Sequence, residues 1–169
     1  GSIYILSFWL ASVLGYSLSI GQRKREETFT NLSYVFLASG TITGLIALCQ
    51  WSNLDSVLPG MVNISGTQRP YANFAQPNNM ATFLLMSLMS CLYLYEKKKN
   101  QTKWLFACAV MIVMGVALSQ SRTAWVAAIA IMLYLVFYQY KGIIRLKWYY
   151  SSLWLFLFIF FIWLFPVLS

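Results

Sequence analysis

The chain has 169 residues and a net charge of +8, and 60% of its residues are hydrophobic whereas only 9% are charged. A soluble domain carries roughly 25% charged residues, so this composition excludes an ordinary soluble enzyme. The basic residues form no stripe interleaved with exposed aromatic side chains, which excludes a nucleic-acid-binding surface as well. The composition indicates a membrane protein whose basic loops also contact anionic lipid.

Long apolar segments follow one another along the chain. A membrane-spanning helix needs about 20 predominantly apolar residues, and six segments meet that requirement. They predict spans at residues 3–20, 31–50, 79–95, 104–120, 123–140 and 148–168. Gly40 and Gly44 form a small-xxx-small step in the second span, which is typical of a helix-packing face. We therefore expect an all-α, polytopic transmembrane helix bundle that makes one domain of residues 1–169.

The basic residues predict how this bundle is oriented. Ten of the 12 lysines and arginines gather in three stretches, at residues 23–25, 97–103 and 141–147. Two predicted spans separate each stretch from the next, so the loops 21–30, 96–103 and 141–147 all lie on one side, which the positive-inside rule makes cytoplasmic. The segments 51–78 and 119–123 then face the periplasm. We also expect an interior piece of a larger inner-membrane protein, because the chain enters and leaves within predicted spans.

Arg69 and Arg122 are the two basic residues left on the periplasmic side. Each lies near the start of a predicted span, where the positive end of the helix dipole points outward and where Ser121 and Thr123 are candidate caps. Two such N-termini with adjacent arginines can form a phosphate-binding site. Neutral donors and acceptors nearby are Gln68, Asn73, Gln76, Asn78 and Asn79. Arginines that contact lipid headgroups and amides that serve turns remain alternative interpretations.

Two short motifs carry a family resemblance. Arg-Pro-Tyr-Ala-Asn-Phe-Ala-Gln-Pro-Asn-Asn-Met-Ala-Thr, at residues 69–82, resembles the periplasmic motif of bacterial protein O-oligosaccharyltransferases, the pilin-glycosylation ligases. Ser-Gln-Ser-Arg-Thr-Ala, at residues 119–124, resembles a segment of the wider O-antigen ligase and polymerase superfamily. The resemblance implies a multi-span glycosyltransferase that moves an oligosaccharide from undecaprenyl pyrophosphate to Ser or Thr of a pilin-like protein. It also implies a reaction at the periplasmic face that needs neither metal nor cofactor.

Carried over residue by residue, the resemblance makes Arg69 and Arg122 the pyrophosphate-binding residues. Asn73, Gln76 and Asn78 would shape the loop or contact the glycan. Ala72 stands where the family often has glycine, which is a mild change if the backbone there is not left-handed. The chain has no histidine, whereas the family carries an important one in a later periplasmic loop. We therefore expect no catalytic residue in this piece, and no activity from it alone.

Other functions remain open at this point. An O-antigen ligase that uses lipid A core as acceptor, and a chain-elongating polymerase, would share the donor and the arginines. The Gln-Pro-Asn-x-x-Ala-Thr pattern at residues 76–82 favours the protein acceptor. A carrier of an anionic lipid or substrate is a further alternative, although no membrane-embedded acid or histidine is available for ion coupling. Cys49, Cys91 and Cys108 lack metal-ligand spacing and are predicted to be small buried hydrophobes.

Overall fold

The computed structural model describes residues 10, 12–15, 21–54, 69–97, 102–142 and 148–168, with only the backbone described for 22, 23, 102, 148–153 and 165–168. The predicted span at 3–20 therefore lies mostly outside the described residues. The elements are α2 (Gln22–Trp51), α3 (Pro77–Lys97), α4 (Thr102–Leu118), α5 (Arg122–Tyr140) and α6 (Trp148–Leu168). No strand occurs among the described residues, so the predicted all-α class is confirmed.

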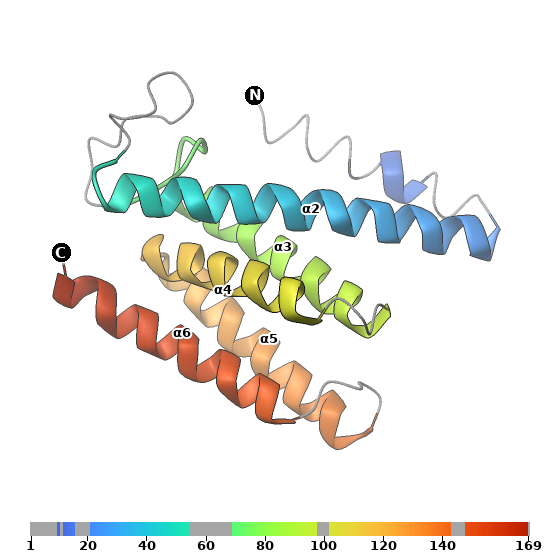
Figure 1. The fold of residues 1–169 in the computed structure, drawn as a ribbon. Helices are drawn as coiled ribbons and strands as arrows, with labels where there is room; N and C mark the ends of the chain where they lie inside the picture. Colours follow the sequence, from blue (N-terminus) through green and yellow to red (C-terminus); the bar gives the residue numbers. More distant parts are fainter. Residues whose placement is uncertain are drawn as a thin grey trace.

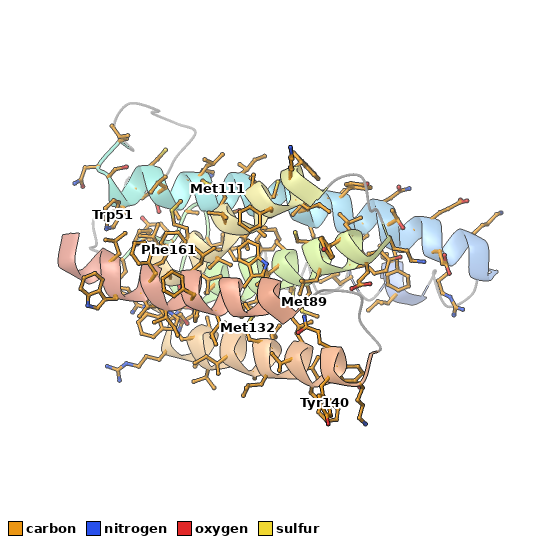
Figure 2. The ribbon with its side chains drawn as sticks, turned by 60° about the horizontal axis from the view of Figure 1, so that its bottom comes forward. Trp51, Met89, Met111, Met132, Tyr140 and Phe161 are labelled. Carbon is orange, nitrogen blue, oxygen red and sulfur yellow. The ribbon has the colours of Figure 1, made fainter. Side chains whose placement is uncertain are left out.

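Successive helices run in opposite directions along a common bundle (Figure 1). The C-terminus of α2, the N-terminus of α3 and the α4–α5 turn therefore lie at one end. Trp51 at the end of α2 and Tyr140 at the end of α5 mark opposite ends of the molecule (Figure 2). The alternation also places Lys97, at the end of α3, and Lys141, after α5, together at the second end. The described basic residues Lys97, Lys103 and Lys141 and the two arginine segments thus occupy opposite ends of the bundle, as the charge pattern predicts.

Two of the described helical segments are long and apolar enough to cross a membrane, Lys24–Trp51 and Arg122–Tyr140. The segments Lys103–Leu118 and Trp154–Leu164 are apolar but shorter. Trp163 and Phe156 are 65% and 64% exposed on α6, and Val126 is 69% exposed on α5. Apolar side chains directed outward from a helical bundle are typical of a protein surrounded by lipid.

Helix α2 differs from the predicted span. It begins at Gln22 rather than at residue 31 and contains 30 residues, about 45 Å of helix. Residues 22–30 of the expected loop 21–30 therefore form the first turns of α2 and make it longer than the roughly 30 Å hydrocarbon core. The physical reason is local: residues 22–29 contain neither Gly nor Pro, and their long charged side chains favour helix. Glu26 also pairs with Lys97 of α3, with Nζ and Oε2 2.9 Å apart.

Glycines allow α2, α3 and α4 to pack closely. Gly40 faces Ser87 of α3, where a Cβ atom would overlap the serine side chain. A Cβ atom at Gly44 would lie 2.6 Å from the carbonyl oxygen of Met111 in α4. One at Gly115 would lie 3.2 Å from the Cα atom of Gly44. The predicted packing face of the second span is thus confirmed, and it brings the α2 and α4 backbones into contact.

The three cysteines behave as packing residues. Cys91 and Cys108 are only 4% and 6% exposed, and Cys49 is partly buried. All three are free thiols, which agrees with their interpretation as small hydrophobes.

Candidate functional site

The side chain of Arg69 joins the two sequence segments that carry the resemblance. Its Nη2 group donates to the carbonyl oxygens of Ser119, at 2.8 Å, and Gln120, at 3.1 Å. Its Nε group donates to the same Ser119 oxygen at 3.2 Å. The guanidinium is partly buried against the turn between α4 and α5. Residues separated by fifty positions along the chain are therefore in direct contact.

The α4–α5 turn has a defined geometry of its own. Gln120 adopts the left-handed conformation, with φ of 48°. Ser119, which is fully buried, accepts a hydrogen bond from the N–H of Ser121 at 3.2 Å. Ser121 is the N-cap of α5 and accepts from the N–H of Ala124 at 3.3 Å, as its position predicts. The other candidate cap, Thr123, places its hydroxyl 3.1 Å from that of Ser121 instead.

Arg122 is the first residue of α5 and its side chain is exposed. It follows directly on the turn that Arg69 contacts, so the structure brings the two arginine-bearing segments to one place. Hydrogen bonds to carbonyl groups leave the positive charge of Arg69 intact. Two arginines and the N-termini of α3 and α5 therefore gather at this end of the bundle, and both kinds of group can bind an anion.

The amide residues of the loop lie beside the start of α3. Asn73, Gln76 and Asn78 all have exposed side chains. The carbonyl oxygen of Gln76 accepts from the N–H of Met80 at 3.2 Å, which starts the hydrogen-bond ladder of α3. Their exposure leaves these amides accessible to a polar ligand, whereas Gln68 lies outside the described residues.

The backbone at Ala72 corrects one expectation. Its φ is 49°, so the condition under which alanine would be a mild replacement for glycine is not met. A left-handed L-residue costs about 1–2 kcal/mol, and Ala72 is only 1% exposed. The strain is offset by a buried side chain from α2, that of Gln50.

Gln50 is a residue whose role the sequence analysis missed. Its Oε1 atom accepts from the backbone N–H groups of Tyr71, at 3.0 Å, and Ala72, at 2.7 Å. Its Nε2 group donates to the carbonyl oxygen of Ala72 at 2.9 Å. The signal in the sequence was an amide at the end of an apolar span, in helical register with Gly40 and Ala47 on the buried face.

Among the described residues, no group of three or more His, Cys, Asp or Glu side chains gathers as a metal site would. In the described part of the chain, the charged side chains at this end of the bundle are those of Arg69 and Arg122. Their chemistry is the binding of phosphate or carboxylate oxygens.

Comparison with known proteins agrees with the family resemblance. The family model described as protein glycosylation ligase matches residues 70–95, the loop end and α3. The chain is 46% identical over 153 residues to the general O-oligosaccharyltransferase of Acinetobacter baylyi, covering 90% of this chain and 27% of that protein. It is 26% identical over 141 residues to the ComP-specific O-oligosaccharyltransferase of the same organism, covering 82% of this chain and 26% of that protein.

The chain thus spans about a quarter of the length of these curated relatives. No solved structure matches it. The matched region includes the segment that follows Arg69. The predicted resemblance is confirmed: over nine-tenths of its length the chain is similar to a bacterial O-oligosaccharyltransferase, and residues 70–95 match the family model of protein glycosylation ligases.

Proposed function

We propose that this chain is part of an oligosaccharyltransferase that acts at the periplasmic face of the bacterial inner membrane. Its donor is a glycan on undecaprenyl pyrophosphate, and its acceptor is a Ser or Thr of a pilin-like protein. The observation that carries the proposal is the contact of Arg69 with Ser119 and Gln120. That contact joins the ligase motif to the turn from which Arg122 projects.

The chemistry asks for stabilisation of a leaving group. The acceptor hydroxyl oxygen attacks the anomeric carbon of the glycan, and the bond between that carbon and the pyrophosphate oxygen breaks. The hydroxyl proton passes to a base, for which we propose a residue outside this chain. Negative charge increases on the departing pyrophosphate, and fixed positive charge placed there lowers the barrier.

The two arginines have different parts in this proposal. Arg122 is exposed at the start of α5 and can give pyrophosphate oxygens a two-pronged, charge-assisted contact. Arg69 adds its positive charge and holds the turn that presents Arg122. The amides of Asn73, Gln76 and Asn78, whose side chains are exposed, contact the polar glycan or shape the loop in this proposal. Protein cations then neutralise the pyrophosphate, so no divalent metal is needed.

The acceptor class is supported by the relatives. Both are named O-oligosaccharyltransferases, and the matched family model is that of protein glycosylation ligases. These names favour a protein acceptor over lipid A core or a growing glycan. They also favour an enzyme over a carrier of an anionic lipid.

The test uses the full-length protein, with the lipid-linked glycan and the pilin as substrates. Arg122→Ala should reduce glycan transfer by roughly 10²-fold, since it removes a charged contact to the leaving group. Arg122→Lys should recover only part of the rate, because a point charge cannot form the two-pronged contact. Lys103→Ala, which removes an exposed charge at the other end of the bundle, is the matched control.

Transfer at the wild-type rate by Arg122→Ala, at normal abundance in the membrane, would contradict the proposal. A chelator should leave the rate unchanged. A loss of activity on chelation, restored by added metal, would contradict the metal-independent mechanism.

A further inference from the structure

A buried glutamine clamps the segment that leads into the ligase motif. Gln50 is 4% exposed, and its side-chain amide bonds both the N–H and the C=O of Ala72 and also the N–H of Tyr71. This loop clamp, formed by Gln50 with the backbone of residues 71 and 72, connects the end of α2 to the loop before α3. The Oε1 and Nε2 atoms of Gln50 bond the N–H and the carbonyl oxygen of Ala72, so the side-chain amide acts as the backbone of a neighbouring strand would.

The loop clamp holds a backbone conformation that alanine does not favour. Ala72 is left-handed, with φ of 49°, and its Cβ atom makes this conformation costly. The next turn is closed by a bond from the N–H of Phe74 to the carbonyl oxygen of Tyr71, at 3.0 Å. The direction in which the chain leaves toward Asn73 and Gln76 therefore depends on the left-handed residue that Gln50 stabilises.

The loop clamp lies close to Arg69 along the chain. Arg69 is three residues before Ala72, and Pro70 between them is buried and restricts the backbone. From this position the guanidinium reaches the carbonyl oxygens of Ser119 and Gln120. A displacement of residues 71 and 72 would thus move Arg69 and loosen its contact with the turn before Arg122.

We infer that Gln50 is a positioning residue for the donor pyrophosphate, acting through Ala72 and Arg69. The inference rests on the proposed function, because it assigns Gln50 to the same site. Gln50 itself does not touch the substrate: it is buried beneath the loop. Its contribution is to keep the two arginines and the start of α3 in one arrangement before the donor binds, which lowers the cost of ordering the site on binding.

The experiment measures transfer by the full-length enzyme as a function of donor and of acceptor concentration. Gln50→Leu removes all three hydrogen bonds while it retains a large side chain. It should raise the KM for the donor about 10-fold or more and leave the KM for the acceptor peptide unchanged. Gln139→Leu, which removes a glutamine near the opposite end of α5, is the matched control and should leave both KM values unchanged.

A second variant separates positioning from folding. Glycine adopts left-handed backbone without the Cβ penalty, so in an Ala72→Gly background Gln50→Leu should raise the donor KM several-fold less than in the wild type. A purely structural role predicts a lower amount of folded protein with no selective change in donor KM. That result, or an equal effect of Gln50→Leu in both backgrounds, would overturn the inference.

Failure of this inference is distinguishable from failure of the proposed function. If Arg122→Ala reduces transfer as expected whereas Gln50→Leu leaves the donor KM unchanged, only the role of Gln50 is lost. If Arg122→Ala transfers glycan at the wild-type rate, the anion site itself is refuted, and the inference falls with it.

Discussion

The sequence analysis gives Arg69 and Arg122 the same role, but the structure predicts that their replacement affects the stability of the fold differently. Arg69→Ala removes three N–H···O contacts to two carbonyl oxygens, one of which belongs to fully buried Ser119. Arg122 is exposed at the helix start. We therefore expect Arg69→Ala to destabilise the folded protein and Arg122→Ala to leave its stability nearly unchanged.

The magnitude follows from the contacts. A hydrogen bond from a charged donor contributes about 1.5–3 kcal/mol, and a buried acceptor left without a partner costs about 1–3 kcal/mol. Ser119 loses two contacts and Gln120 loses one, but Gln120 is only half-buried and water can replace its partner. We expect a loss of about 2–4 kcal/mol for Arg69→Ala, against roughly 0.5 kcal/mol or less for Arg122→Ala.

The buried cysteines supply the assay. Cys91 and Cys108 are 4% and 6% exposed, so a thiol-reactive fluorophore labels them when the protein unfolds on heating. Arg69→Ala should lower the unfolding temperature clearly, and Arg69→Lys should restore part of it, because an ammonium group cannot bridge both carbonyls equally well. An unfolding temperature for Arg69→Ala equal to that of the wild type would refute the structural role of Arg69. A large decrease for Arg122→Ala would refute the separation of the two roles.

Three further predictions address the packing, the topology and the ion pair. Gly44→Ala should destabilise the bundle by about 1–3 kcal/mol in the same thermal assay, because its Cβ atom would lie 2.6 Å from the Met111 carbonyl oxygen; Gly21→Ala, which meets nothing within 4 Å, is the control. Cysteines introduced at Asn63 and at Gly142 should be labelled from opposite sides of the membrane, and labelling from the same side would contradict the topology. The hydrogen bond and charge of Glu26 raise the pKa of Lys97 above its usual 10.5. The stabilising effect of this ion pair should therefore be present at neutral pH and be lost only as the pH rises through the raised pKa of Lys97. A Lys97→Met variant whose unfolding temperature differs from that of the wild type by an amount that changes between pH 6 and 8 would contradict this.

Much of the architecture could be predicted because it depends on local composition. Apolar runs interrupted by basic stretches predict alternating helices with the basic residues at one end, and the described part of the chain has this arrangement. The Gly40–Gly44 step predicted a packing face, since only small side chains let helix backbones approach so closely. The family resemblance of residues 69–82 and 119–124 could likewise be recognised, because each motif consists of consecutive residues. The predicted start of the second span, at residue 31, was wrong, because the charged residues before it suggested a loop whereas their side chains favour helix.

What only the tertiary structure decided concerns contacts between residues far apart in the chain. Nothing near Arg69 in the sequence shows that its guanidinium meets the carbonyl groups of Ser119 and Gln120. Nothing near Ala72 shows that it is left-handed, because Gln50, which stabilises that conformation, lies 22 positions earlier on another helix. Nearly every residue has both a backbone carbonyl and an N–H group, so the sequence does not show which of them a distant side chain will contact. The chain alone therefore specified which residues carry charge, and packing of the helices decided which of those charges holds the fold and which one faces outward.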